Sequence, residues 1–339
     1  MRVALVGLGM VSKTFADAIR NSDKVDLGPV FARSRESRAA FLAAHPDLNA
    51  VEATSLDAIA TDPSVDFVIV TTPPDARAEI VETFAKAGKP ILMEKPIERN
   101  LAAAEAIVET CESHGVPLGI TLQHRARPQT ADLIARQGAL GPLIAVENNV
   151  PWWRPQSYYD ESGRGTYARD GGGVLITQAI HPIDLMLSLT GPVSEVTAMC
   201  ATSGFHDMEG EDFVVAGLRF ENGAVGQLFA STASFPGQGE TMTLHCQNGS
   251  ARLDRGMLIL NWQDGRVEEL GQMAASGAGA DPMAFTSDWH RFVIEDFAEA
   301  LAENRPPLVT GRSALGVHRL IEAIEASGKS GTRVKLQND

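Results

Sequence analysis

The fold is indicated most clearly by one N-terminal stretch, Val3-Ala4-Leu5-Val6-Gly7-Leu8-Gly9-Met10-Val11-Ser12. Its first four residues are apolar without alternation, which is typical of a short strand buried on both faces of a parallel sheet. The glycines then predict a tight turn into a helix over residues 12–21, whose free N–H groups and dipole favour a bound anion. Gly7, Gly9 and Ser12 occupy the three positions of the dinucleotide-binding fingerprint, although the third position is usually Gly or Ala. We therefore predict a nucleotide-binding turn here.

The same pattern of strand and helix continues to about residue 121. Further buried strands are predicted at residues 27–32, 67–70, 90–93 and 118–121. Helices are predicted around residues 38–42, 76–87 and 101–113. Alternation of this kind predicts a parallel sheet with helices on both faces.

The second half of the chain has a different character. A strand at 143–150, a polar aromatic loop at 151–170 and a helix at about 173–189 precede six or seven strand candidates between residues 193 and 270. Turn signals such as Glu221-Asn222-Gly223 separate these candidates and predict an antiparallel sheet of hairpins. Two helices, at 288–304 and 313–327, and a short strand at 333–335 are predicted to follow.

These patterns predict an α/β fold with two domains. Residues 1–122 are expected to form a Rossmann domain, a doubly wound parallel sheet that binds a dinucleotide. Residues 123–339 are expected to form an α+β domain with a large, mostly antiparallel open sheet that binds substrate and mediates oligomerisation. The final helices are candidates to pack back on the first domain.

Composition narrows the classes of function. The chain has 339 residues, of which 44% are apolar, and a formal net charge of −14. The negative charge disfavours non-specific binding to nucleic acid or anionic membranes. No stretch approaches the roughly 18 apolar residues of a membrane helix, and the N-terminus lacks the pattern of a signal peptide. The three cysteines are far apart, so we expect a cytoplasmic protein without a disulfide framework or a metal site.

Five segments, taken in their order, resemble the glucose–fructose oxidoreductase, inositol dehydrogenase and MocA family. Each segment is a weak signal by itself, but the five together span nearly the whole chain. They are Thr72-Pro73-Pro74, Glu94-Lys95-Pro96, Gln123-His124-Arg125 with Pro128, Gly171-Gly172-Gly173 with His181 and Asp184, and Arg305-Pro306-Pro307-Leu308-Val309-Thr310-Gly311.

The resemblance implies an NAD(P)-dependent oxidoreductase that moves a hydride between the nicotinamide and a hydroxyl carbon of a sugar, polyol or sugar acid. Tyr158-Tyr159 and Arg164-Gly165-Thr166 resemble a subgroup of which some members act on sugar nucleotides or uronic acids. A sugar-nucleotide dehydrogenase, for a UDP-sugar or a uronate, is therefore one alternative. A non-catalytic, dinucleotide-binding regulatory protein is another, and the retention of both Lys95 and His181 argues against it.

Lys95 and His181 are the predicted catalytic residues. Lys95 follows a parallel strand at its carboxyl end, where open α/β sheets bind ligands, and its ammonium suits an alkoxide or a polarised carbonyl. His181 is the better acceptor of the hydroxyl proton. Thr177 stands where the family often has an Asp beside this His, so Asp184, on the same helical face, is one candidate to orient His181. Equally, Asp184 is a candidate to hold its helix against the first domain.

The predicted substrate-binding residues surround this helix and the aromatic loop. They are Arg125, Tyr159, Arg164, Thr177, Gln178 and Asp184. The aromatic loop offers flat rings for stacking on a sugar, with Arg154, Arg164 and Arg169 as candidates to meet a carboxylate or phosphate. An aromatic plug that packs the loop onto the sheet is an equal alternative.

The end of the second strand predicts the cofactor. NAD enzymes of this fold commonly carry an acidic residue about 20 residues past the glycine turn, and that position is Ala32 here. Arg33, Ser34 and Arg35 follow and suit a 2′-phosphate, so we predict NADP, with NAD as the alternative. The predicted cofactor-binding residues are Gly7, Gly9, Met10, Val11, Ala32, Arg33, Ser34, Arg35, Thr72, Pro73, Glu94, Lys95 and Gln123.

Two expectations concern the surface of the second domain. The acidic loop around His206, Asp207, Glu209, Glu211 and Asp212 is expected to be solvated rather than to bind a metal. The segments 214–218 and 226–230 carry apolar residues at both parities of a strand. We therefore expect the outer face of the sheet to be buried in a homodimer or homotetramer that acts on a small carbohydrate-type substrate.

Overall fold

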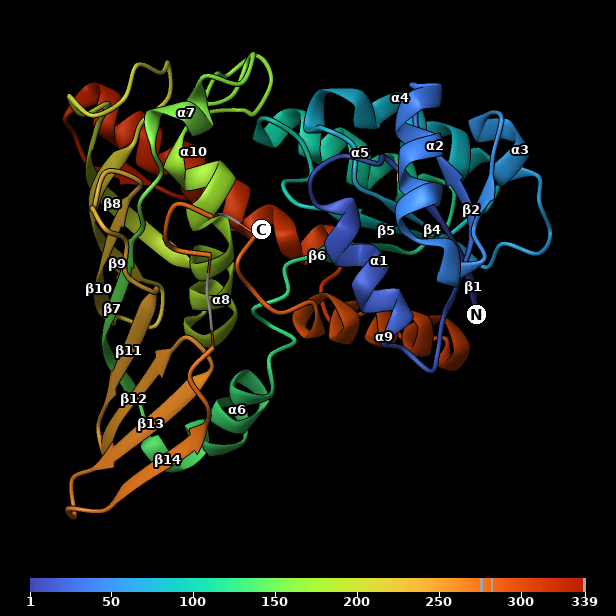
Figure 1. Ribbon diagram of the computed structural model, residues 1–339. Helices are drawn as coiled ribbons and strands as arrows, with labels where there is room; N and C mark the ends of the chain where they lie inside the picture. The colour runs from blue at the N-terminus through green and yellow to red at the C-terminus, as the bar shows by residue number, and fades with distance from the viewer. Residues whose placement is uncertain (275–276, 282, 338–339) are drawn as a thin grey trace. The chain divides into compact units, whose positions relative to one another are not determined.

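The computed structural model describes residues 1–274, 277–281 and 283–337 (Figure 1). The chain forms two compact units. Unit 1 contains Met1–Gln123 and Ser287–Leu315, and unit 2 contains His124–Thr286 and Gly316–Asp339. The first part of the closing helical region, Ser287–Leu315, therefore belongs to the same unit as the N-terminal residues.

Unit 1 contains a six-stranded parallel sheet in the order β3-β2-β1-β4-β5-β6. Its strands are β1 Arg2–Val6, β2 Asp26–Phe31, β3 Val51–Glu52, β4 Phe67–Val70, β5 Ile91–Glu94 and β6 Leu118–Thr121. β4, β5 and β6 are buried along their whole length, as unbroken apolar runs require. The chain changes direction across the sheet between β1 and β4, which is where open α/β sheets bind ligands beyond the carboxyl ends of their strands.

The helices of unit 1 differ at their N-termini, and only some begin with a side-chain cap. The helices are α1 Ser12–Arg20, α2 Arg35–Ala44, α3 Leu56–Ala60, α4 Arg77–Lys86, α5 Leu101–Ser113 and α9 Asp288–Glu303. The side chains of Ser34, Ser55 and Asn100 each accept a hydrogen bond from the backbone N–H three residues later. α9 packs against α1. The predictions omitted β3 and α3, because two and five residues carry too little pattern.

Unit 2 contains a nine-stranded sheet in the order β14-β13-β12-β11-β7-β10-β9-β8-β15. Its strands are β7 Leu143–Pro151, β8 Val193–Ala201, β9 Phe213–Phe220, β10 Val225–Ser231, β11 Thr241–Cys246, β12 Gly249–Asp254, β13 Met257–Trp262, β14 Val267–Gly271 and β15 Val334–Lys335. The pair β7–β10 is parallel and the other pairs are antiparallel. The predicted fold class is confirmed in both sheets.

The helices of unit 2 depart further from the predictions. They are α6 Pro128–Leu140, α7 Gln156–Tyr159, α8 Ile180–Thr190 and the later part of α10 Gly311–Ser330. α6 was not predicted. The helix predicted over 173–189 is not uniform, because a π-helical segment, Leu175–Ala179, precedes α8. α6 and α8 lie against the same face of the sheet in Figure 1.

The outer face of the nine-stranded sheet is chemically mixed. Along β9, Val214, Ala216 and Leu218 are buried, whereas Val215 and Gly217 are exposed. Polar pairs cross the outer face as well, such as His245 with Glu147 at 3.1 Å. The two parities of these strands therefore differ in burial, and the outward parity is less apolar than the sequence pattern alone indicates.

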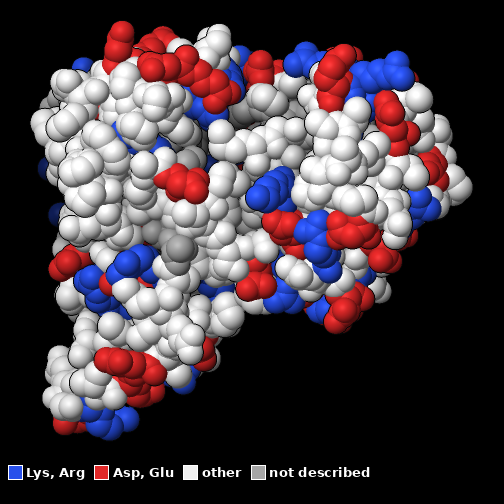
Figure 2. All heavy atoms as spheres, in the orientation of Figure 1, with Lys and Arg blue, Asp and Glu red and all other residues white. Residues whose placement is uncertain are grey.

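The surface in Figure 2 carries acidic and basic side chains in small mixed groups among a larger area of uncharged residues. Among the described residues, no helix is long and apolar enough to cross a membrane. The same residues contain no group of three or more His, Cys, Asp or Glu side chains that suits a metal ion.

Candidate active site and dinucleotide cradle

The glycine turn between β1 and α1 leaves space for a ligand. Gly7 has a φ of +99°, and a Cβ there would lie 2.7 Å from the amide nitrogen of Thr72. A Cβ on Gly9 would meet no atom within 4 Å, so the backbone here is open to a close approach. The Ser12 amide donates to the Gly9 carbonyl at 3.1 Å, but α1 has no side-chain cap to occupy the N–H groups that follow. This turn fits the pyrophosphate of a dinucleotide.

The end of β2 presents two cationic side chains. Arg33 and Arg35 are exposed, and neither forms an ion pair with another described residue. The Ser34 hydroxyl caps α2 at the Ser37 amide and donates to Glu36 at 2.7 Å. A carboxylate therefore lies next to the two arginines, a feature that the sequence analysis did not weigh. The Ala32 carbonyl accepts a hydrogen bond from Arg38 at 2.5 Å.

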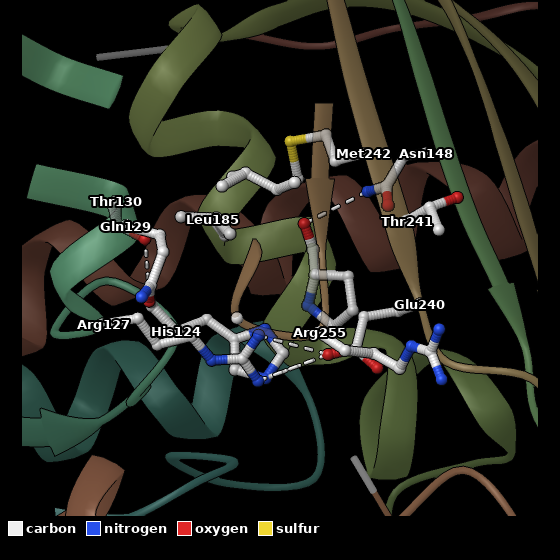
Figure 3. Close-up of a pocket in the computed structure, with 13 residues that line it drawn as sticks. His124, Arg127, Gln129, Thr130, Asn148, Leu185, Glu240, Thr241, Met242 and Arg255 are labelled. Carbon is white, nitrogen blue, oxygen red and sulfur yellow. Dashed lines mark hydrogen bonds and ion pairs between the residues drawn. The ribbon is translucent and has the colours of Figure 1, made fainter. Parts of the chain in front are cut away.

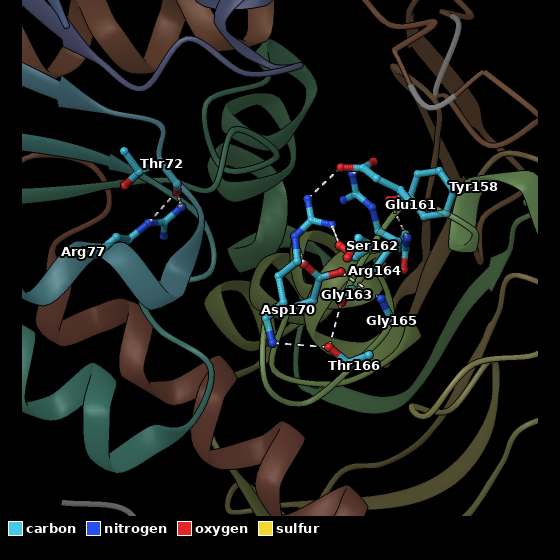
Figure 4. Close-up of polar contacts among 12 residues, drawn as sticks. Thr72, Arg77, Tyr158, Glu161, Ser162, Gly163, Arg164, Gly165, Thr166 and Asp170 are labelled. Carbon is cyan, nitrogen blue, oxygen red and sulfur yellow. Dashed lines mark hydrogen bonds and ion pairs between the residues drawn. The ribbon is translucent and has the colours of Figure 1, made fainter. Parts of the chain in front are cut away.

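Lys95 follows β5 in a turn that a buried arginine holds. The Arg77 guanidinium donates to the Thr72 carbonyl through Nε at 3.0 Å and Nη2 at 2.8 Å (Figure 4). Its Nη1 donates to the carbonyls of Glu94 and Pro96. Burial lowers the pKa of Arg77 to about 10. Burial also raises the pKa of Glu94 to about 7, although the charges of Lys95 and Arg77 oppose the shift.

Two buried residues of unit 1, Arg77 and His290, were not predicted as site residues. Arg77 shares a helical face with the buried residues Ile80, Val81 and Phe84, and a charge in that core pattern was the available signal. His290 on α9 is fully buried and meets the Phe15 ring edge-on, with 5.1 Å between centroids. Burial, with a smaller contribution from Lys95, lowers the pKa of His290 to about 3, so this ring is neutral.

In unit 2, His181 on α8 stacks on a second histidine. The rings of His124 and His181 lie 5.1 Å apart at 25°. Arg127 contacts Nε2 of His124 and binds Glu240 at 3.2 Å (Figure 3). A guanidinium only donates, so Nε2 of His124 is an acceptor and its neutral tautomer carries the hydrogen on Nδ1. His124, Arg127 and Glu240 line a small cavity of about 20 Å³, large enough for one water molecule.

Asp184 is fully buried and binds Arg125. The Arg125 Nε donates to Oδ2 of Asp184 at 2.7 Å, and its Nη2 donates to Oδ1. Both oxygens are thus occupied by one guanidinium in a bidentate pair. The pair joins α8 to the segment before α6, so the contacts of Asp184 anchor this helix within unit 2 and do not orient His181.

Thr177 and Gln178 lie in the π-helical segment just before His181. The Thr177 hydroxyl donates to the Gly173 carbonyl at 2.5 Å and also contacts Gln178. Gln178 reaches the Tyr158 hydroxyl at 3.4 Å. Tyr159, by contrast, is buried and shares a 2.7 Å hydrogen bond with Thr232, and burial raises its pKa. Tyr158 rather than Tyr159 therefore joins the aromatic loop to the helix of His181.

The arginines of the aromatic loop bind partners within unit 2. Arg164 lies over the Tyr158 ring at 4.8 Å, and both Arg164 and Arg169 bind Glu161 at 2.7 Å (Figure 4). Arg154 is buried and donates to the carbonyls of Trp153 and Gly279. The three guanidiniums are thus engaged with protein acceptors rather than directed into an open pocket.

The acidic loop is divided: Asp207 and Glu209 are exposed as expected, but His206, Glu211 and Asp212 are buried, so the expectation that they are solvated is wrong. Glu211 accepts hydrogen bonds from the amides of Gly173 at 3.2 Å and Leu175 at 2.9 Å. His206 contacts Asp212 at 2.7 Å and the Arg154 carbonyl at 2.9 Å. These contacts cap the helical segment of His181 and hold the aromatic loop. A Cβ on Gly173 would lie 1.9 Å from the Glu211 carbonyl, which explains that glycine.

Comparison with known proteins places these elements in one family. Residues 1–122 match the model of the oxidoreductase family with an NAD-binding Rossmann fold, and residues 129–252 match the GFO/IDH/MocA C-terminal domain. The chain belongs to the GFO/IDH/MocA family. It is therefore an oxidoreductase that uses a nicotinamide dinucleotide.

Relatives span nearly the whole chain. D-apiose dehydrogenase of Paraburkholderia graminis is 28% identical, covering 99% of this chain and 89% of its own. D-xylose 1-dehydrogenase (NADP(+)) 2 of Haloferax volcanii is 27% identical over 83% and 84%. The crystal structure of the WlbA dehydrogenase of Bordetella pertussis, in complex with NADH and UDP-GlcNAcA, has a TM-score of 0.83 at 27% identity and covers 100% and 98% of the two chains.

Proposed function

We propose that this chain transfers a hydride between the nicotinamide and a hydroxyl-bearing carbon of a sugar, polyol or sugar acid. The observation that carries the proposal is the turn after β5, where Lys95 lies between two carbonyls bound by Arg77 and one strand away from the loop that packs on Gly7. Dehydrogenases of D-apiose and D-xylose among the relatives support the same class of substrate.

In this proposal the side chains have distinct roles. Gly7, Gly9 and Val11 hold the pyrophosphate at the start of α1, and the bound nicotinamide supplies the hydride acceptor or donor. The Lys95 ammonium stabilises the alkoxide oxygen, and His181 accepts the hydroxyl proton. The buried pair of Arg125 and Asp184 keeps α8, and with it His181, in place.

A neutral sugar or polyol fits unit 2 better than a sugar nucleotide. The WlbA dehydrogenase is solved with UDP-GlcNAcA, a ligand that brings a carboxylate and phosphates. In this chain Arg164 and Arg169 already bind Glu161, Arg169 also lies 3.7 Å from Asp170, and the Arg154 guanidinium is engaged by backbone carbonyls. A negatively charged substrate would have to displace these acceptors.

The test is a panel of matched substrates assayed with NADP and NAD. We expect a higher kcat/KM for a neutral sugar, such as D-glucose or D-xylose, than for the corresponding uronate or its UDP-linked form. A higher kcat/KM for the UDP-linked sugar would favour the sugar-nucleotide alternative instead. Dinucleotide binding without turnover of any member would contradict the proposed function and favour a regulatory protein.

For the cofactor, the proposal is NADP in preference to NAD. Arg33 and Arg35 are exposed without an ion-pair partner among the described residues, and Ala32 replaces the acidic group that would repel a 2′-phosphate. The D-xylose dehydrogenase relative is named for NADP(+), whereas the WlbA dehydrogenase is solved with NADH. The Glu36 carboxylate, which binds the Ser34 hydroxyl, opposes a negatively charged 2′-phosphate. We therefore expect only a small preference for NADP.

For the assembly, the proposal is a cytoplasmic homodimer or homotetramer whose contact includes the outer face of the nine-stranded sheet. Met199 and Val215 are exposed on this sheet at 56% and 41%, and Phe213 and Phe229 pack edge-on at 5.4 Å. Apolar groups of this kind on a broad sheet are typical of subunit interfaces. A monomer mass by light scattering at micromolar concentration would contradict the assembly.

A further inference from the structure

Arg77 is among the largest fully buried side chains of the described residues. It is the first residue of α4, and its guanidinium enters the sheet edge beyond the carboxyl ends of β4 and β5. Its four hydrogen bonds all go to backbone carbonyls, two to Thr72 and one each to Glu94 and Pro96. A buried guanidinium is costly, so this arrangement needs strong acceptors in return.

These carbonyls belong to two segments that face the cofactor cradle. Glu94 and Pro96 flank Lys95 in the chain, so Arg77 binds the backbone on both sides of that residue. Thr72 packs directly on the glycine turn, since a Cβ on Gly7 would lie 2.7 Å from its amide nitrogen. One side chain therefore connects the Lys95 turn to the loop that packs on the dinucleotide-binding turn.

We propose that Arg77 is a positioning residue that sets the place of the Lys95 ammonium relative to the dinucleotide cradle. Arg77 bonds only to backbone carbonyls, so it acts through Lys95 and does not take part in the chemistry itself. The inference rests on the proposed role of Lys95. Only arginine offers five N–H donors in a rigid planar fork, whereas a lysine ammonium has three donors at one point and cannot bind both segments with the same geometry.

The test compares Arg77→Lys and Arg77→Met with Lys89→Met as a matched control. The Lys89 ammonium also binds two backbone carbonyls, those of Asp62 and Val65, both at 2.7 Å, but these precede β4 at the opposite edge of the sheet. We expect Arg77→Lys to lower kcat by about tenfold or more with a small change in the dissociation constant for NADPH, because misplaced reacting groups cost rate rather than binding. Lys89→Met is expected to keep kcat within about twofold, as is usual away from reacting groups.

A double-mutant cycle separates positioning from a general structural role. If Arg77 acts through Lys95, then Arg77→Lys in the Lys95→Ala background changes the remaining rate by less than about threefold. Equal loss of rate in both backgrounds, or an equal effect of Lys89→Met, would overturn the proposal. Retention of the wild-type kcat by Arg77→Lys would overturn it as well.

A second readout does not depend on turnover. The rate at which an amine-reactive reagent modifies Lys95 in the protein without substrate, followed by mass spectrometry, reports the surroundings of that ammonium. We expect this rate to change in Arg77→Met and to stay unchanged in Lys89→Met. If Lys95→Ala turns over normally while the labelling result holds, then the proposed function fails and the positioning by Arg77 stands. An unchanged labelling rate in Arg77→Met would refute the positioning.

Discussion

Two buried arginines support the residues that we assign to the chemistry, and they do so in different ways. Arg77 in unit 1 binds backbone carbonyls around Lys95. Arg127 in unit 2 binds the Glu240 carboxylate and the His124 ring that stacks on His181. The first arrangement uses backbone acceptors, which every sequence offers, whereas the second depends on one specific acidic side chain 113 residues away.

The carboxylates nearby show the same contrast. Glu240 binds the Arg127 guanidinium through Oε1, whereas the buried Glu94 forms no ion pair with a described residue; in both carboxylates Oε2 has no hydrogen-bond partner among those residues. An ion-pair partner compensates the cost of burying a carboxylate charge. Without such a partner, burial favours the protonated, neutral carboxyl. We therefore expect the surroundings of Glu240 to respond to the loss of a charge partner and those of Glu94 to respond to pH.

The largest effects are expected at the two residues that these arginines support, Lys95 and His181. Lys95→Ala and His181→Ala should each lower kcat by about 100-fold or more, since general acid–base help is worth roughly 10²–10⁴. Dinucleotide binding should survive, because the glycine turn is untouched. His245→Ala, on the outer face of the sheet, is the control and should keep its rate. Near-normal turnover of either variant would show that the substituted residue is not catalytic. The arginine that supports it would then have no role in the chemistry.

The next prediction concerns the ion pair between Arg127 and Glu240 in unit 2. Arg127→Met should lower the free energy of unfolding by about 3–5 kcal/mol, because it leaves Glu240 buried with an uncompensated charge. The double variant Arg127→Met with Glu240→Met should recover most of this loss. Urea unfolding of the two variants measures both values. If the double variant is no more stable than the single one, then the carboxylate is not the source of the loss.

In unit 1 the matching prediction concerns pH and Glu94. Its pKa is about 7 in the folded chain and 4.5 in the reference state, so the native state holds the proton more tightly. Its stability contribution is therefore present below pH 4.5 and is lost as the pH rises through 7. Between pH 5 and pH 8 the loss should amount to about 2–3 kcal/mol.

Glu94→Gln is the variant that isolates this loss. It should match the wild type in unfolding free energy at pH 5 and exceed it at pH 8, because a neutral amide replaces a carboxylate that must otherwise ionise while buried. Burial, the largest cause, raises the pKa of Glu325 to about 7 as well, and that contribution is present in both proteins and cancels in the difference. A variant shifted equally at both pH values would contradict the role of Glu94.

The sequence predicts best the elements that burial constrains on all sides. β4, β6 and α5 have the predicted bounds, because strands buried on both faces need unbroken apolar runs and α5 begins at an Asn cap. α6 escaped prediction because it buries only Thr130, Leu133 and Leu140, and because the exposed Ile134 among its remaining residues blurs the apolar stripe. The π-helical segment before His181 has no periodic signature that distinguishes it from an α-helix.

The candidate site shows a similar limit. Motifs indicated the backbone positions, such as Gly7 and Lys95, because local chain geometry and the strand ends determine where those residues lie. The partners of the buried arginines were not predictable, because Arg127 meets Glu240 only when distant strands assemble. Tyr158 and Tyr159 illustrate the same point, since neighbours in sequence point to different surroundings, and only the fold decides which ring is buried.

The smallest expected effect concerns the cofactor, where charges at the surface act without burial. Wild type should prefer NADP over NAD in kcat/KM by about tenfold or less, because tenfold corresponds to about 1.4 kcal/mol and exposed ion pairs rarely exceed 1 kcal/mol each. Ala32→Asp should reverse the preference by repelling the 2′-phosphate. Glu36→Gln should increase the preference, because it removes the carboxylate that the Ser34 hydroxyl now binds at 2.7 Å. Arg266→Ala, an exposed arginine paired with Asp264 in unit 2, is the control and should change neither value. If wild type instead prefers NAD by tenfold or more, then Arg33 and Arg35 do not bind the phosphate, and the exposed arginines of unit 1 do not select the cofactor.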